Sequence, residues 1–77
     1  MNEQLDSGKP TREQLARIEE HVRCRVLGRV RDFQVVSRDD GLVLRGHVHN
    51  YYTKQLAQHA VREMTELPIW ANEIEVS

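Results

Sequence analysis

Two histidines, His47 and His49, flank a valine in an apolar stretch, and side chains at this spacing could bind a metal ion. In a strand, residues i and i+2 point to the same face, so both imidazoles could reach one ion. Zinc needs three or four ligands, and His21 or His59 would have to complete the site. Because two histidines supply only half of a site, we favour two solvent-facing side chains and keep metal binding as the weaker alternative.

Arginines are concentrated in the middle of the chain and could bind an anionic partner. Residues 21–49 contain six arginines against three acidic residues, a charge of +3, whereas the rest of the chain carries −4 and the whole chain −1. Such segments either contact anions or only keep the surface soluble. Each basic residue near anionic lipid contributes about 1 kcal/mol, so a few give weak, salt-sensitive association. The residues predicted to contact an anionic phospholipid surface or an acidic partner protein are Arg23, Arg25, Arg29 and Arg31.

Two tyrosines follow the second histidine and could belong to the same surface. Tyr51 and Tyr52 come directly after Asn50, at the expected corner between a strand and a helix. Tyrosine rings anchor proteins at membrane interfaces, which makes the pair candidate interfacial anchors. The same rings could instead pack against the start of the helix as a staple, and we favour this second interpretation.

The sequence does not indicate catalysis. The one cysteine, Cys24, lies three residues after His21, and this imidazole could activate the thiol on the surface of a helix. No oxyanion hole and no Gly-x-Ser-x-Gly elbow accompanies the pair. A single cysteine also forms neither an intrachain disulfide nor a Cys-x-x-Cys site. We therefore predict a protein that is not an enzyme and carries no cofactor.

Length and composition favour one small folded domain. The chain has 77 residues, of which 39% are apolar and 30% charged. Residues 1–10 are polar and predict a disordered tail, which leaves 11–77 as the domain. The N-terminus lacks the apolar region of a secretory signal, and no apolar run is long enough to span a membrane. We expect a cytoplasmic protein, or one of the cell envelope if the chain is cut from a longer precursor.

The first element that would position these groups is a helix beginning after Thr11. The residues Thr11 to Gln14 fit a capping box, in which each side chain binds the backbone of the other. Gly28 is expected at the C′ position that ends the helix. The apolar stripe has helical spacing and consists of Leu15, Ile18, Val22 and Val26.

From Val30 onward the period changes to that of strands. The segment 31–38 places Phe33 and Val35 on one face, and Asp40-Gly41 predicts a hairpin turn. In the return strand, 42–49, the inner residues are Leu42, Leu44, Gly46 and Val48. The outer residues are Val43, Arg45, His47 and His49, so the histidines share a face with an arginine.

A second helix and a third strand complete the pattern. Asn50 is a good N-cap for residues 51–64, and Pro68 prevents the helix from continuing. The inner stripe of this helix consists of Thr53, Leu56, Ala57, Ala60, Val61 and Met64. The segment 69–76 then alternates, with Trp70, Asn72, Ile74 and Val76 on one face. The order helix, strand, strand, helix, strand predicts an α+β fold, with a three-stranded mixed sheet and both helices packed on one face.

Two motifs of this sequence resemble a known family. Leu44, Gly46 and Val48 form a Leu-x-Gly-x-Val motif ahead of an alanine-rich helix. The second motif, Leu-x-x-Trp-x-Asn-x-Ile-x-Val, consists of Leu67, Trp70, Asn72, Ile74 and Val76. Over residues 12–77 the chain resembles the BON domain of bacterial osmotic-induction and nodulation proteins. It departs from that pattern at Trp70, where the family usually has a small β-branched residue.

The resemblance implies a bacterial binding or interaction module, associated with osmotic stress and with binding to phospholipids. It also implies an alternative function as a potassium-type cation sensor, for which the loop Asp39-Asp40-Gly41 would offer oxygen ligands. The element order also favours, less strongly, a KH-like nucleic-acid binder, although the Gly-x-x-Gly loop of that class is missing. Self-association is a further alternative. From the residues themselves, we expect Gly46 and Asn72 to specify the fold rather than to do chemistry.

Overall fold

The computed structural model describes residues 10–77 and contains two helices and three strands. In chain order they are α1 (Arg12–Arg25), β1 (Arg31–Arg38), β2 (Gly41–Val48), α2 (Tyr51–Met64) and β3 (Ile69–Val76). This order confirms the predicted α+β fold. The predicted tail, residues 1–10, lies outside the described residues except for Pro10, which is partly buried beside α1.

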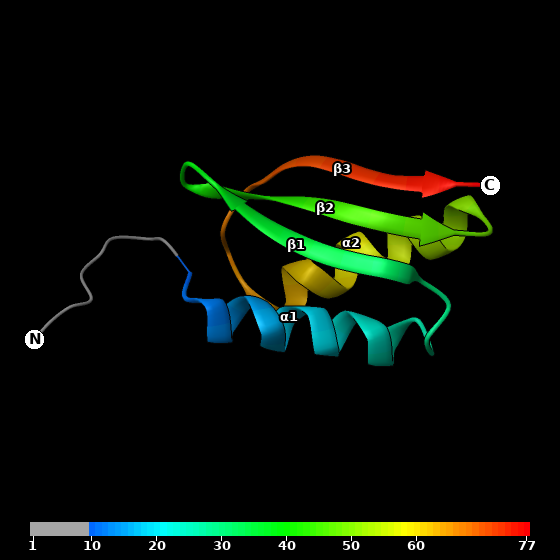
Figure 1. Ribbon diagram of the computed structural model, residues 1–77, viewed down its shortest axis with the longest axis horizontal. Helices are drawn as coiled ribbons and strands as arrows, with labels where there is room; N and C mark the ends of the chain where they lie inside the picture. The colour runs from blue at the N-terminus through cyan, green and yellow to red at the C-terminus, as the bar shows by residue number, and fades with distance from the viewer. Residues whose placement is uncertain (1–9) are drawn as a thin grey trace, which may run out of the picture.

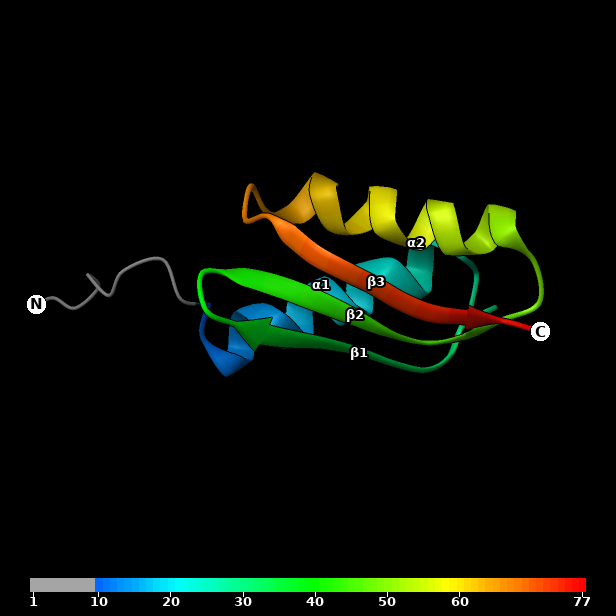
Figure 2. The same ribbon diagram turned by 90° about the horizontal axis from the view of Figure 1, so that it is seen from above.

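The three strands form one mixed sheet with β2 in the centre. β1 pairs with β2 antiparallel through a hairpin, and β3 pairs with β2 in parallel after the crossover through α2. Both helices cover the same face of the sheet and lie against each other (Figures 1 and 2). Since α1 ends where α2 begins, the loops 26–30 and 49–50 meet at one end of the molecule (Figure 1).

The core lies between this helix pair and the inner face of the sheet. Ala57 and Ala60 of α2 are fully buried, and their small side chains let the helix backbone approach the strands. Met64 was predicted to be an inner residue but is 41% exposed, because it ends α2 beside an open groove. The buried apolar core consists of Ile18, Val22, Val26, Val30, Phe33, Val35, Leu42, Leu44, Val48, Ala57, Ala60, Val61 and Ile74.

Helix α1 begins as its sequence predicts. The Thr11 hydroxyl accepts a hydrogen bond from the Gln14 amide at 3.0 Å, and the Gln14 side chain accepts one from the Thr11 amide at 2.8 Å. This reciprocal capping box satisfies two donors that have no partner within the helix.

The end of α1 differs by one residue from the prediction. Gly28 lies at C″, where its amide donates to the Arg23 carbonyl at 2.9 Å, and Leu27 occupies C′. The Leu27 amide donates to the Cys24 carbonyl at 3.2 Å, which completes a Schellman motif. Leu27 therefore has a left-handed φ of 56°, a conformation that non-glycine residues rarely adopt, and its side chain is exposed.

A bulge in β1 explains why β2 needs a glycine at position 46. The register with β2 shifts between Arg31 and Gln34, and Asp32 within the bulge has a φ of 54°. A Cβ atom on Gly46 would lie 3.2 Å from the Arg31 carbonyl and 3.3 Å from the Phe33 Cα atom. The fold-specifying role expected of Gly46 thus has a physical basis, a close approach of the β1 backbone.

A second irregularity corrects the predicted faces of the first part of β3. The register with β2 shifts between Leu42 and Val43, and Trp70 falls in the gap. Trp70 therefore does not share the inner face with Ile74: it is 55% exposed and covers Gly41, and its indole N–H donates to the Arg38 carbonyl at 3.0 Å. The hairpin loop consists of Asp39 and Asp40. Gly41 was predicted to belong to the turn, but it is the first residue of β2.

The outer face of the sheet is less polar at this end than expected. Val43 was assigned to a solvent-exposed face, yet it is only 3% exposed. It pairs directly with Val36 on one side and with Ala71 on the other, and these neighbours form an apolar row. The prediction that Val43 faces solvent is therefore wrong.

Two side chains satisfy backbone amides that lie outside the strand ladders. Glu19 of α1 accepts a hydrogen bond from the Val35 amide of β1 at 2.9 Å. Asn72 accepts one from the Ile74 amide of β3 at 3.1 Å and donates one to Gln58 of α2 at 2.9 Å. Asn72 thus joins β3 to the crossover helix, as expected of a residue that specifies the fold. Unpaired strand amides invite pairing with other chains, and these two are occupied.

Candidate functional site

The four arginines that the sequence groups together fall into two pairs. Arg23 lies 3.9 Å from Glu19 and 3.7 Å from Glu20, one turn back along α1. Arg25 makes a two-pronged contact with Glu63 of α2, at 3.0 Å and 3.1 Å. The charges of Arg23 and Arg25 are therefore already balanced by the protein itself.

The Glu63 carboxylate lies between the two helices, beside two histidines as well as Arg25. The imidazole of His21 lies 2.9 Å from its carboxylate and that of His59 3.7 Å. The hydrogen bond to His21 and the contact with Arg25 hold the pKa of Glu63 below its ordinary value of 4.5, although desolvation opposes the shift. His21 and His59 thus lie beside a carboxylate and not beside the His47–His49 pair, so the weaker alternative of a metal site lacks the two histidines that would have completed it.

The other two arginines, Arg29 and Arg31, line a cavity of about 390 Å³ at the end of the molecule where α1 stops and α2 starts. Across residues 10–77, neither guanidinium forms an ion pair with a carboxylate. A smaller cavity of about 150 Å³ adjoins it and shares Arg31 and His49. The complete lining of the larger cavity is Gly28, Arg29, Arg31, His49, Asn50 and Thr53. We call this region the basic end.

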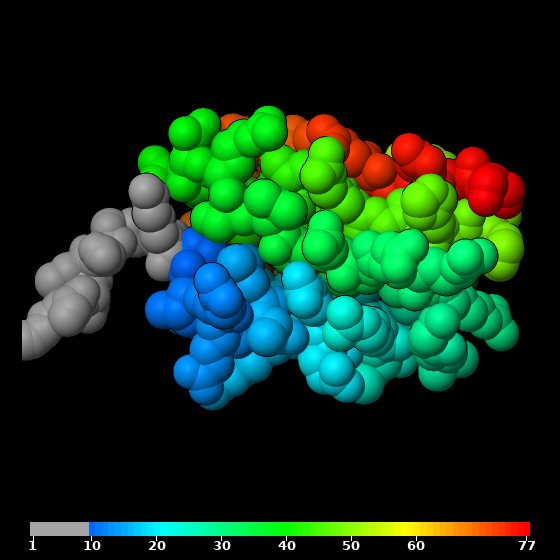
Figure 3. Space-filling model, viewed as in Figure 1, coloured from blue at the N-terminus to red at the C-terminus, as the bar shows by residue number. Residues whose placement is uncertain are grey.

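Large apolar side chains project from the basic end. Tyr51 and Tyr52 are 63% and 72% exposed, so they do not pack as the staple that we favoured from the sequence. Leu27 is 77% exposed at the end of α1. Leu27 follows α1 and the two tyrosines open α2, so all three belong to the end of the molecule where α1 stops and α2 starts. The segments at this end lie on the right of the space-filling view (Figure 3). Leu27 was not predicted to belong to this surface, although its place between the apolar stripe and Gly28 was a usable signal.

The two histidines of the pair have different surroundings. His47 lies 2.9 Å from the Glu75 carboxylate, its neighbour on β3, and both side chains face the solvent. His49 lies beyond the end of β2 at the cavities of the basic end. Within the described part of the chain, no three His, Cys, Asp or Glu side chains converge on a metal position, and this includes Asp39 and Asp40.

Cys24 lies exposed on α1, as expected. In the described chain its thiol donates a hydrogen bond to the Glu20 carboxylate at 3.9 Å. His21, whose imidazole could have activated the thiol, instead lies 2.9 Å from the Glu63 carboxylate. Within residues 10–77, no hydrogen bond joins the thiol to this imidazole.

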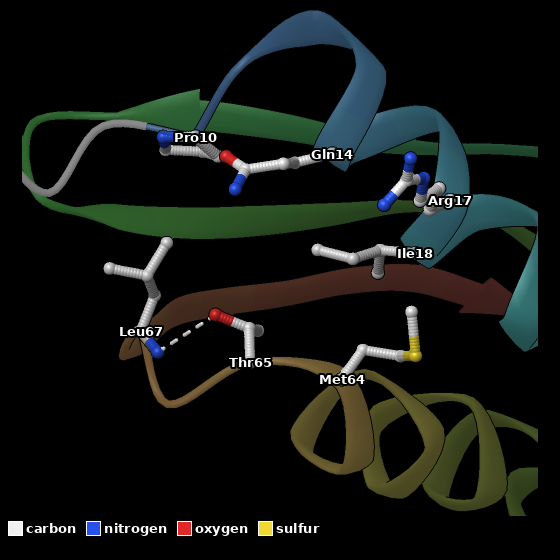
Figure 4. A pocket seen from close by; sticks show the side chains of 7 residues that line it. All are labelled: Pro10, Gln14, Arg17, Ile18, Met64, Thr65 and Leu67. Atoms are coloured by element: carbon white, nitrogen blue, oxygen red, sulfur yellow. Dashed lines mark hydrogen bonds between the residues drawn. The ribbon is translucent and has the colours of Figure 1, made fainter. Parts of the chain in front are cut away.

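A groove of about 450 Å³ lies at the opposite end, between the start of α1 and the end of α2. Ile18, Met64 and Leu67 form its apolar walls (Figure 4). Its polar side chains are already occupied: Gln14 in the capping box, Arg17 with Glu13 at 3.3 Å, and the Thr65 hydroxyl with the Leu67 amide at 3.1 Å. The groove is large enough for a small ligand, but it has few free polar groups to bind one.

Comparison with known proteins leaves the resemblance to the BON domain as a prediction. No family model, no curated protein and no solved structure matches this chain. In residues 10–77, neither helix has the length and apolar character needed to cross a membrane.

Proposed function

We propose that this protein is a non-catalytic binding module that associates with anionic phospholipid surfaces through its basic end. The observation that carries the proposal is a combination of two features at this end. Arg29 and Arg31 have no carboxylate partner within residues 10–77, and three exposed apolar side chains lie near them, Leu27 after α1 and Tyr51 and Tyr52 at the start of α2. Cations attract the head groups, and tyrosines are favoured at the depth where head groups meet acyl chains. Phospholipid binding is also what the resemblance to the BON domain implies.

The distribution of charge supports one orientation. The acidic hairpin loop, Asp39-Asp40, lies at the far end of β1 from the basic end (Figure 1). A negative surface attracts one end of the molecule and repels the other, so a chain of net charge −1 can still dock. Two basic residues near anionic lipid contribute about 2 kcal/mol together, which predicts weak association that high salt abolishes.

Vesicle sedimentation tests the proposal. The chain is mixed at low salt with phosphatidylcholine vesicles, with or without phosphatidylglycerol. We expect sedimentation only with the anionic lipid. The variant Arg29→Gln/Arg31→Gln should bind about 30-fold more weakly, since it loses about 2 kcal/mol.

The matched control is Arg17→Gln/Arg23→Gln, which removes the same charge from α1, where carboxylates already balance it. This control should bind much like the parent chain. Equal losses in the two double variants would mean that only net charge matters, and the basic end would then not be the binding surface. Absence of binding to anionic vesicles at low salt would overturn the proposal altogether.

A further inference from the structure

The two adjoining cavities of the basic end differ from the groove at the opposite end in the balance of their charges. Three side chains that can carry positive charge line the larger cavity, namely Arg29, Arg31 and His49, and no acidic residue does. Asp32 is the one acid that lines the smaller cavity. At the groove of the opposite end, by contrast, Arg17 is already paired with Glu13.

These side chains suit an anion with several oxygens. An arginine offers a planar fork of N–H donors that matches two oxygens at once, and the imidazole of His49 adds another nitrogen. At about 390 Å³ the cavity lies near the lower limit of about 300 Å³ for small-molecule pockets. It therefore fits a head group and its hydration water rather than a large ligand.

The start of α2 adds to the field of the arginines. Asn50 accepts a hydrogen bond from the Thr53 amide at 2.8 Å, and the first turn contains no acidic residue. The positive end of the helix dipole is thus not compensated by a carboxylate. This contribution is secondary, because Arg29, Arg31 and His49 define the site.

We infer that the cavity lined by Arg29, Arg31 and His49 binds a phosphate monoester, carried either by a lipid head group or by a soluble molecule. A monoester has a charge between about −1.5 and −2 near neutral pH and three terminal oxygens. A phosphodiester has one negative charge and two such oxygens, so it leaves part of the donor set unmatched. This inference deepens the proposed function and rests on it only for the lipid-borne form.

The lipid-borne form is tested with vesicles of equal surface potential, one set containing phosphatidic acid, a monoester, and the other phosphatidylglycerol, a diester. We expect about tenfold tighter binding to phosphatidic acid. The variants Arg31→Gln and His49→Gln should bind the two lipids about equally, so that the preference is lost. Arg31→Gln should also weaken binding to phosphatidylglycerol about fivefold, because this arginine contributes about 1 kcal/mol to the general attraction. The control Arg23→Gln should keep the preference, because Arg23 is held by Glu19 and Glu20.

The soluble form is tested with glycerol 3-phosphate, a monoester, against glycerophosphoglycerol, a diester, while backbone amide shifts are followed by NMR. Saturable shifts at Gly28, His49 and Tyr51 with the monoester alone would support the site. Equal vesicle binding to both lipids, together with no such shifts, overturns the monoester site but leaves the proposed function standing. Saturable shifts without vesicle binding have the reverse meaning: the site then takes soluble phosphates, and the membrane proposal fails.

Discussion

The two ends of the central strand β2 show the same arrangement with opposite consequences. At each end a neighbouring strand departs from regular pairing, and β2 places a glycine against the irregularity. Gly46 faces the backbone of the β1 bulge at the basic end, whereas Gly41 lies under the indole ring of Trp70 near the hairpin. A side chain can rotate away from a new methyl group, but two paired strands cannot separate without losing their hydrogen bonds.

This difference bears on function. The β1 bulge comes directly after Arg31, so the rigid contact at Gly46 fixes the strand that presents this arginine to the cavity. Gly41 and Trp70 instead lie at the other end of the strand, away from the candidate site. We therefore expect changes at the two glycines to differ both in their effect on stability and in their effect on vesicle binding.

The largest effect is expected for Gly46→Ala. The added methyl group would meet Val30 at 3.1 Å and the Arg31 carbonyl at 3.2 Å, at a residue whose φ of 154° disfavours side chains. Overpacking and backbone strain together should lower the free energy of unfolding by about 2–4 kcal/mol. Urea denaturation measures this loss. A smaller loss in the free energy of unfolding than that of Gly41→Ala would contradict the proposed difference between the two glycines.

A smaller effect is expected for Gly41→Ala. The methyl group would displace the indole of Trp70 and break its hydrogen bond to the Arg38 carbonyl, at a cost of about 1 kcal/mol. Tryptophan fluorescence should shift as the ring moves, and vesicle binding should be unchanged. In a Trp70→Ala background the same change should become neutral or slightly stabilising, because alanine suits a strand better than glycine. If Gly41→Ala lowers the stability by the same amount in that background, the added methyl group clashes with backbone and not with the indole.

Leu27→Gly should separate stability from function at the basic end. Leu27 has a left-handed φ of 56°, which glycine adopts without strain, so the variant should be more stable by about 0.5–1 kcal/mol. It should also bind anionic vesicles about fivefold more weakly, since an exposed apolar anchor worth about 1 kcal/mol is lost. The control is Asp39→Gly, which relieves a φ of 54° in the hairpin loop. This control variant should gain similar stability and bind vesicles no more weakly than the parent chain. An equal loss of vesicle binding in both variants would contradict the role of Leu27.

Local periodicity was sufficient to predict most of the fold. The capping box at Thr11, the helical stripe through Ile18 and the buried pair Phe33 and Val35 depend on neighbours within four residues, which the sequence displays directly. The face of Trp70 could not be predicted this way. One extra residue in a strand moves a side chain to the opposite face, and nothing local to Trp70 signals the shift.

The candidate site was predictable only in part. The basic segment was visible, but the division between Arg25 and Arg29 depends on Glu63, which lies 38 residues from Arg25 along the chain. Likewise the partner of His47 is Glu75, brought beside it by the parallel pairing of β2 with β3. Charge patterning along a sequence identifies which groups are available, whereas tertiary packing decides which of them remain without partners.

The smallest predicted effect on the free energy of unfolding concerns Glu63, which joins α2 to α1. Hydrogen bonding to His21 and contact with Arg25 lower the pKa of Glu63 below 4.5 in the folded state. Since the unfolded chain holds that proton more tightly, the ionised carboxylate stabilises the fold above about pH 4.5 and loses this contribution as the pH falls through its folded-state pKa. Denaturation of the parent chain and of Glu63→Gln between about pH 6 and pH 3 measures it. The difference between the two should shrink on acidification, and a constant difference would mean that Glu63 contributes through packing and not through its charge.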